Sequence, residues 1–319
     1  MSIKTGGAAS AMSASVGIAT TVSRTYRANP ENNQDAAVRI ALSDRNIVIV
    51  SDGIGSHYAA KEAAWAAVKA AARFIQKQGG LGDPFAFFQS VNQTMTRIAE
   101  RMRERLLAEE SAVLDPNQFF GTTLIVAEET EHLLTIAYVG NGAIFHIRGR
   151  FMDFPEYVSL PWSALNLLNP HTCNENGKES LYKYLSPASS PEMATPTVLQ
   201  ISKDQQCGDI ILIASDGVYS HDQIQRGTDP EGEVWLSAEK TAVRVIQSLR
   251  ALFNKPEPIQ EADAEKALTD ALTEMKEAQW LEDDATLGLL ITPAALSYQQ
   301  RQRKGERDGD SDTDDMPVF

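Results

Sequence analysis

Several features are scarce in this sequence, and each scarcity excludes a class of protein. The chain of 319 residues has two cysteines, Cys173 and Cys207, and neither lies in a spacing typical of a metal-binding pair. No apolar run reaches the length of about 18 residues that a membrane-spanning helix needs. The N-terminus also lacks the continuous apolar segment of a signal peptide. We therefore expect a cytoplasmic protein with reduced cysteines and no membrane partner.

Basic residues are also few. Lys and Arg number 29 against 43 Asp and Glu, which gives a formal net charge of −14. Because a surface that binds nucleic acid needs clustered positive charge, we expect no nucleic-acid partner. The hydrophobic share of 43% is sufficient for a large core.

Hydrophobic periodicity separates strand runs from pairs of helices. Strands are expected near 15–23, 36–42, 46–50, 121–129, 132–140, 143–149, 209–217 and 283–291. Helix pairs are expected at 58–78 with 84–106, and near 237–253 with 261–279. Strand runs that are separated from helix pairs favour antiparallel sheets with helices packed outside. We therefore predict an α+β fold, a four-layer α-β-β-α sandwich of two antiparallel sheets flanked by antiparallel helix pairs.

The two ends of the chain and one internal segment lack this periodicity. Residues 1–14 are expected to form a flexible tail, 15–295 a single domain, and 296–319 a disordered, charged tail. Residues from about 151 to 197 are rich in Pro, Asn and Ser, and we predict a long excursion over the surface there.

Carboxylates stand at the ends of several predicted strands. Asp52 and Asp216 each follow an apolar strand within a Ser-Asp-Gly sequence, Asp283 precedes the last strand, and Asp35 closes the sequence NNQD. Clustered carboxylates repel one another unless a cation neutralises them, and oxygen donors suit Mg²⁺ or Mn²⁺. Gly53 leaves its main-chain carbonyl uncrowded and able to bind an ion as well. Because Asp-Gly is also a common turn dipeptide, the residues alone leave a turn and a metal site as alternatives.

Six short motifs in a fixed order narrow these alternatives. They are NNQDA, SDGIGS, FGTTL, AYVGNGAIFHIRG, DIILIASDGVYS and EDDATLGLLI. In this order they resemble the metal-dependent protein phosphatase 2C family, especially its bacterial members, between Ser15 and Thr292. The resemblance implies a central β-sandwich flanked by helix pairs, which agrees with the periodicity.

The same resemblance implies a reaction and a set of residue roles. The family removes phosphate from phosphoserine and phosphothreonine by direct attack of water activated by two Mn²⁺ or Mg²⁺ ions. Asp52, Asp216 and Asp283 would then be the catalytic residues. Asp52 would bridge both ions, and the Gly53 carbonyl would bind one of them. Asp216 and Asp283 would bind the other ion, and Asp35 would hold water beside them.

Two departures from the family pattern concern the phosphate and a third ion. An insertion lengthens the spacing before Asp35, so that Arg27 is the expected phosphate-binding residue and Arg24 is a weaker alternative. Either arginine could also be a solvated loop residue. Asn141 stands where bacterial relatives have an Asp that helps to bind a third ion. We therefore expect a third metal to be weak or absent.

Other departures concern the leaving group and the support of the site. Gln34 stands where many relatives have Glu, and Ile54 stands where eukaryotic members have a general-acid His. Water, or no acid at all, would then serve the leaving group. His57 is close to this position but is expected on the surface at the start of a helix. Thr122 and Thr123, in FGTTL, are expected to support the site from the core.

The leading hypothesis is a Mn²⁺- or Mg²⁺-dependent phosphatase that acts as a monomer on phosphorylated proteins. A eukaryotic-like Ser/Thr kinase would be its natural opponent, and that kinase and its phosphorylated targets would be its partners. One alternative is a catalytically weak, phosphatase-like binding or regulatory protein, and another is a phosphatase of small phosphoesters. The physiological substrate and the roles of the excursion and the acidic tail stay open.

Overall fold

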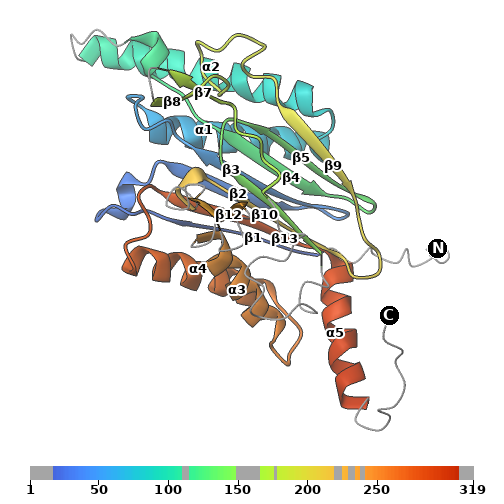
Figure 1. Ribbon diagram of the computed structural model, residues 1–319. Helices are drawn as coiled ribbons and strands as arrows, with labels where there is room; N and C mark the ends of the chain where they lie inside the picture. Colours follow the sequence, from blue (N-terminus) through green and yellow to red (C-terminus); the bar gives the residue numbers. More distant parts are fainter. Residues whose placement is uncertain are drawn as a thin grey trace, which may run out of the picture.

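The computed structural model describes residues 17–109, 115–148, 166–175, 178–218, 225–228, 234–237 and 241–308. Two antiparallel sheets lie face to face, and pairs of helices cover their outer faces (Figure 1). The predicted α+β class and the four-layer α-β-β-α sandwich are therefore confirmed. No helix in the described ranges is long and apolar enough to cross a membrane.

The first sheet has four strands in the order β1-β13-β10-β6, and all neighbours are antiparallel. The strands are β1 (Ile18–Arg24), β13 (Ala285–Ile291), β10 (Asp209–Ala214) and β6 (Ala143–Arg148). Every residue of β10 and β13 is buried, because one face meets the other sheet and the opposite face meets helices. This double cover explains why both strands are continuous apolar runs in the sequence.

The second sheet has five strands in the order β2-β3-β4-β5-β9, again with antiparallel neighbours. The strands are β2 (Asp35–Ala41), β3 (Asn46–Asp52), β4 (Leu124–Glu129), β5 (Leu133–Val139) and β9 (Thr197–Ser202). In the β2–β3 register Asp35 lies opposite Asp52. The end of β3 therefore lies beside the start of β2, and two predicted site residues meet there.

The two helix pairs lie on opposite outer faces of the sandwich. Helices α1 (Ala60–Gln78) and α2 (Pro84–Glu109) pack on the second sheet, and α3 (Thr241–Phe253) and α4 (Glu261–Glu277) pack on the first. Small buried residues such as Ala63 and Ala67 let α1 approach the sheet closely. A separate core between the sheets includes Val50, Tyr138 and Leu290. These three layers of apolar contact hold the strand ends in fixed relative positions.

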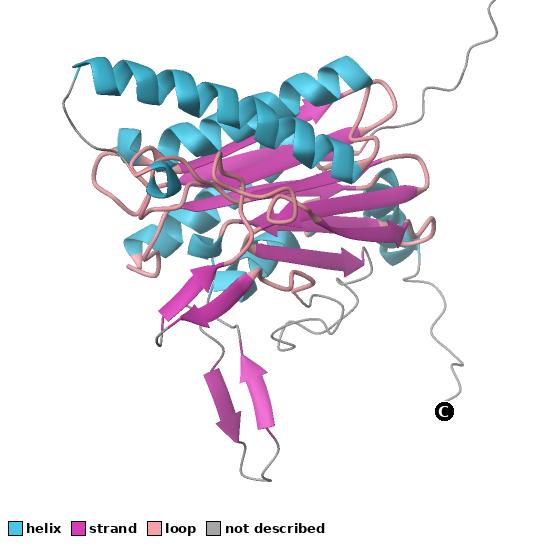
Figure 2. Ribbon diagram, turned by 90° about the horizontal axis from the view of Figure 1, so that it is seen from above, coloured by secondary structure: helices cyan, strands magenta, loops and turns pink. Residues whose placement is uncertain are grey.

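Short elements occupy the segments that the periodicity left undefined. Within the excursion, residues 151–165 lie outside the described residues. The remainder contains the hairpin of β7 (Thr172–Glu175) and β8 (Lys178–Leu181), and β9 begins at its end. A second hairpin pairs β11 (Gln225–Thr228) with β12 (Val234–Ser237), and both hairpins stand apart from the main sheets (Figure 2). Short 3-10 helices are η1 (Pro30–Asn32), η2 (Pro116–Gln118) and η4 (Asp216–Val218).

The prediction of a disordered tail over 296–319 is wrong for its first part. Helix α5 spans Pro293–Asp308, whereas residues 309–319 lie outside the described residues. Gln, Arg, Lys and Glu are good helix formers, so a highly charged segment can still be helical. The helix is also anchored at its start, because Ala295 is buried and the Gln299 side-chain amide donates to the carbonyls of Phe253 and Lys255.

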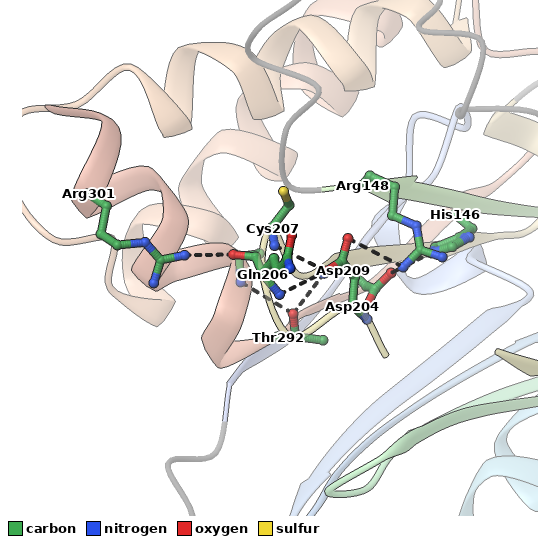
Figure 3. A network of polar contacts seen from close by, with 9 residues as sticks. His146, Arg148, Asp204, Gln206, Cys207, Asp209, Thr292 and Arg301 are labelled. Carbon is green, nitrogen blue, oxygen red and sulfur yellow. Dashed lines mark hydrogen bonds and ion pairs between the residues drawn. The ribbon is translucent and has the colours of Figure 1, made fainter. Parts of the chain in front are cut away.

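A buried carboxylate closes the end of the sandwich at which β10 begins (Figure 3). Asp209 is fully buried and accepts hydrogen bonds from the His146 ring at 2.7 Å, from Arg148 at 2.5 Å, and from the Asp204 main-chain N–H at 2.7 Å. Its own N–H donates to the Thr292 hydroxyl, just after β13. We call these contacts the Asp209 network. They satisfy both oxygens of the carboxylate and join three strand ends.

Candidate metal and phosphate site

The four predicted acids gather at the opposite end of β10. Asp35 and Asp52 face each other across the β2–β3 pair. Burial raises the pKa of Asp52 well above its usual range, and the charges of Asp35, Asp216 and Asp283 raise it further. The structure therefore brings all four carboxylates within electrostatic reach of one another. Their mutual repulsion is the physical condition that a bound cation would relieve.

Asp35 links the two sheets. Its side chain is buried, and burial raises its pKa to about 8. The Ser215 hydroxyl, which follows β10 in the other sheet, donates to Asp35 Oδ2 at 2.8 Å. The same hydroxyl accepts from the Thr286 N–H at 2.9 Å. Asp35 Oδ1 has no hydrogen-bond partner within the described ranges, so one buried oxygen is left unsatisfied.

The serine of each Ser-Asp-Gly sequence supports the site from behind. The Ser215 hydroxyl donates to the Asp35 carboxylate, and the Ser51 hydroxyl donates to the Thr123 carbonyl at 2.7 Å. Thr122 donates to the Asp52 carbonyl at 2.6 Å, and the Thr123 hydroxyl accepts from the Asp52 N–H at 3.1 Å. Both threonines are buried, as the supporting role expected from FGTTL requires. The main chain of Asp52 is therefore fixed on both sides.

Gly53 is required by close packing of the main chain. A Cβ at this position would lie 2.3 Å from the carbonyl oxygen of Ala60, a distance that real Cβ atoms essentially never show. The Gly53 N–H donates to the Gln34 carbonyl at 3.2 Å. The sequence suggested an uncrowded carbonyl as the reason for this glycine, whereas the structure gives the start of α1 as the nearer reason.

Asp284 is a buried acid that the sequence reasoning did not single out. The Thr25 hydroxyl donates to its Oδ1, and the Gln34 N–H donates to its Oδ2 at 2.7 Å. Its neighbour Asp283 is exposed and accepts the Asp284 N–H at 2.8 Å. Partial desolvation raises the pKa of Asp283, and the charges of Asp216 and Asp284 add to this. The two consecutive Asp residues of EDDAT were the only sign in the sequence that a second acid lies here. Their surroundings differ, because Asp284 is buried and Asp283 is exposed.

Arg27 is held by the loop that the insertion creates. The insertion forms η1, and Arg27 Nη1 donates to the Asn32 carbonyl at 2.7 Å. Arg27 Nη2 donates to the Gln34 side-chain oxygen at 3.2 Å, and the guanidinium lies 5.2 Å from the centre of the Tyr26 ring. The longer spacing is thus absorbed by a loop that folds back on the arginine.

Arg27 also lies within electrostatic reach of the acidic cluster. A hydrogen bond with Tyr26 raises the pKa of Arg27, and the charges of Asp284 and Asp283 raise it further. The alternative, Arg24, is exposed at the end of β1 opposite Ala285. The structure therefore brings Arg27 to the acids and ties its guanidinium to neutral acceptors.

His57 is buried, and its expected place on the surface is wrong. Its side chain is 9% exposed and packs edge-on against Tyr184, with 5.8 Å between ring centres. Burial lowers its pKa, and its Nδ1 has no hydrogen-bond partner among the described residues. Just before α1, the Ala59 N–H donates to the Phe119 carbonyl at 2.9 Å, so the segment around Phe119 lies against the start of the helix. The helix start is therefore covered.

The donor set suits a hard divalent cation by chemical type. Asp35 Oδ1 and Asp216 Oδ1 are buried oxygens without partners in the described part of the chain, and such oxygens are rare in folded proteins. Within that same part, no group of three or more His, Cys, Asp or Glu is close enough to enclose an ion by itself. Mg²⁺ commonly binds through one or two carboxylates and keeps several waters, so an open set of this kind fits it.

Known proteins share sequence and fold features with this chain. The family described as protein phosphatase 2C matches residues 24–159. Among curated proteins, none matches the chain at a significant level.

Solved structures extend the likeness to most of the chain. A PPM Ser-Thr phosphatase from Mycobacterium smegmatis, in complex with cacodylate, is 19% identical over 87% of this chain and 99% of its own, with a TM-score of 0.52. A serine/threonine phosphatase from Staphylococcus aureus is 15% identical over 87% and 96%, with a TM-score of 0.54. A sex determining protein of Caenorhabditis elegans is 13% identical over 90% and 67%, with a TM-score of 0.56. These structures show the fold, and with the family match they confirm the resemblance to phosphatase 2C.

Proposed function

Since the chain carries the phosphatase 2C fold, we propose that it is a Mn²⁺- or Mg²⁺-dependent phosphatase of phosphoserine and phosphothreonine in proteins. The main support for the proposal is the arrangement of four carboxylates. Asp35, Asp52, Asp216 and Asp283 converge at one end of the sandwich, and two of their oxygens are buried without a partner in the described residues. We assign residues 15–295 to the single catalytic domain.

We propose that these acids hold two cations. Asp52, common to both, the Gly53 carbonyl, Asp216 and Asp283 would hold the cations, and Asp35 would orient water beside them. Bound divalent ions would lower the pKa of water and offset the negative charge that phosphoryl transfer develops. The chain's own contribution is the rigidity of the strand ends, since both Ser-Asp-Gly segments are fixed by hydrogen bonds across β-strands.

Arg27 is the phosphate-binding residue in this proposal. A guanidinium has five N–H donors in a planar fork, and the described contacts of Arg27 use two of its terminal nitrogens for neutral acceptors. Donors therefore remain for phosphate oxygens, and the charge of Arg27 is not neutralised by a direct ion pair in the described residues. Its position near Asp283 would place the phosphate between the arginine and the cations.

The substrate is proposed to be a phosphorylated protein, with a Ser/Thr kinase as the opposing enzyme, and the protein is proposed to act as a cytoplasmic monomer. The alternative of a weakly active binding protein is less well supported, because the four carboxylates converge. Asn141 donates to Asp216, and we propose that a third ion is weak or absent for this reason.

Hydrolysis of p-nitrophenyl phosphate and of a phosphothreonine peptide tests the proposal, with Mn²⁺, with Mg²⁺ and with chelator. We expect turnover that needs the metal and disappears in Asp216→Asn. The matched control is Asp270→Asn, which removes an exposed acid on α4, paired with Lys266, and should leave turnover unchanged. A folded wild-type protein that is inactive at millimolar metal would overturn the enzyme proposal.

A further inference from the structure

The turn between β5 and β6 lies between the two Ser-Asp-Gly segments. A Cβ at Gly140, with φ +108°, would lie 2.6 Å from the side chain of Thr123, which holds the first segment. A Cβ at Gly142, with φ +131°, would lie 2.5 Å from the carbonyl oxygen of Ala214, which directly precedes the second segment. Both glycines are therefore required, and the turn touches both segments of the site.

The residue at the centre of this turn binds one of the predicted metal ligands. Asn141 Nδ2 donates to Asp216 Oδ2 at 2.7 Å. An ionised carboxylate only accepts hydrogen bonds, so the amide nitrogen of Asn141 must be the atom that faces it. The second oxygen, Asp216 Oδ1, is the buried atom without a partner. The amide therefore occupies one oxygen of Asp216 and leaves the other available.

The turn itself is held by a residue of the excursion. The His171 N–H donates to the Gly140 carbonyl at 3.0 Å, and His171 Nδ1 accepts from the Gly140 N–H at 3.1 Å. Because Nδ1 accepts, the proton of the neutral ring lies on Nε2, which donates to the Thr197 hydroxyl at 2.9 Å. The ring stacks on Tyr138 with 5.1 Å between centres. The excursion is thus joined to the site through two reciprocal hydrogen bonds.

We propose that Asn141 is a positioning residue for Asp216. Its amide fixes the carboxylate so that Oδ1 alone is presented to a divalent cation, and His171 holds the turn that carries the amide. This inference rests on the proposed function, because it gives Asp216 the role of metal ligand. Partners of this kind orient metal ligands, and removing one typically weakens metal binding by about 10- to 100-fold.

Two double-mutant cycles with Asn141→Ala and Asp216→Ala test the inference. The first cycle measures the free energy of unfolding in urea with EDTA, where no metal contributes. We expect the two substitutions to be non-additive, because each removes the same hydrogen bond. The second cycle measures Mn²⁺ binding by calorimetry. Asn141→Ala should raise the Mn²⁺ dissociation constant about tenfold in the wild-type background and should have no further effect on Asp216→Ala.

A matched control separates positioning from general support of the turn. Asn166 accepts the Ile144 and Leu168 N–H groups through its side chain and so stabilises the same region without touching Asp216. Asn166→Ala should lower stability and leave Mn²⁺ affinity unchanged. His171→Phe keeps an aromatic ring beside Tyr138 but removes the acceptor, and it should weaken Mn²⁺ binding less than Asn141→Ala.

The outcomes are distinguishable. Additive stabilities in EDTA would show that the Asn141–Asp216 contact does not exist, whatever the protein's activity. Coupled stabilities with equal Mn²⁺ affinities in wild type and Asn141→Ala would overturn the positioning role and leave the proposed function standing. A wild type that binds no Mn²⁺ would overturn the proposed function, and the positioning role with it.

Discussion

Strand β10 runs between two carboxylates with opposite surroundings. Asp209, at its start, is fully buried and accepts from His146, Arg148 and the main chain of Asp204. Asp216, just after its end, accepts from Asn141 through one oxygen, and its other oxygen is buried without a partner in the described residues. The same strand therefore ends in a satisfied acid at one side and an unsatisfied acid at the other.

The difference shows how a stabilising carboxylate can be told from a functional one. Buried polar atoms are nearly always paired, because an unpaired one costs about 1–3 kcal/mol. The Asp209 network follows this rule and joins strand ends. The acids around Asp52 depart from it, and burial, together with the neighbouring carboxylates, raises the pKa values of Asp35 and Asp52. Such a departure is expected where a ligand supplies the missing partner.

The largest effect is expected from Asp52→Asn at the unsatisfied end. Turnover should fall about 10³-fold or more, because the proposed bridge between two cations is lost. The free energy of unfolding in EDTA should stay equal or rise, since the substitution removes a charge that Asp35 and Asp216 repel. Phosphatase assays and urea unfolding give the two values. A large loss of stability with unchanged turnover per folded molecule would reverse the assignment.

Asp209→Asn should give the opposite pattern. The free energy of unfolding should fall by about 2 kcal/mol, because Asp209 is buried and the partly exposed Arg148 loses a charge-assisted hydrogen bond. The kcat of the folded protein should not change, because this residue lies at the far end of β10. Urea unfolding and steady-state kinetics on the same sample check both statements. Loss of turnover in a stable Asp209→Asn protein would contradict the comparison.

The two ends also use arginine differently. Arg27 binds neutral acceptors near the acids, whereas Arg148 is paired directly with Asp209. Arg27→Ala should raise the KM for a phosphopeptide about tenfold, the equivalent of about 1.4 kcal/mol, with little change in stability. Arg148→Ala should lower stability and leave KM unchanged, and Arg24→Ala should change neither. If Arg24→Ala raised the KM more than Arg27→Ala did, Arg24 and not Arg27 would be the phosphate-binding residue.

The smallest effect is a dependence of stability on pH. Burial raises the pKa of Asp35 to about 8 in the folded protein, so the folded state holds its proton when the unfolded state has lost it. The contribution of Asp35 to stability is therefore full below about pH 4 and is lost as the pH rises toward 8. In EDTA, the stability of wild type relative to Asp35→Asn should fall across this range by at least about 1.4 kcal/mol, the value of one pKa unit.

Urea unfolding of both proteins at several pH values measures this difference and cancels the contributions of His57 and His171. Saturating Mn²⁺ should abolish the fall, because a cation favours the ionised carboxylate. A difference that is flat in EDTA would show that Asp35 is already ionised in the folded protein.

Much of the framework was predictable because local patterns encode it. The buried runs of β10 and β13 and the apolar stripes of α1 and α2 appear directly in the sequence. The polar hairpin β7–β8 and the partly exposed edge strand β9 carry no comparable pattern, and they were not predicted. Helix α5 was missed because its charge, which favours disorder, was given more weight than its helix propensity.

The candidate site was predictable in its acids and less so in their partners. Asp35, Asp52, Asp216 and Asp283 are marked by strand ends and motif order, and they do converge. Ser215 was not assigned a role, because its hydrogen bond with Asp35 crosses between sheets, 180 residues apart in the chain. Contacts of this kind depend on how the two sheets meet, and no local pattern records that arrangement.

The central claim is that the unsatisfied end of β10 binds divalent cations and the satisfied end does not. Calorimetric titration of Mn²⁺ into wild type, Asp216→Asn and Asp209→Asn tests it most directly. The account predicts that wild type and folded Asp209→Asn bind Mn²⁺ alike, and that Asp216→Asn loses at least one binding event. Unchanged Mn²⁺ binding in Asp216→Asn, with binding lost in a folded Asp209→Asn protein, would contradict it.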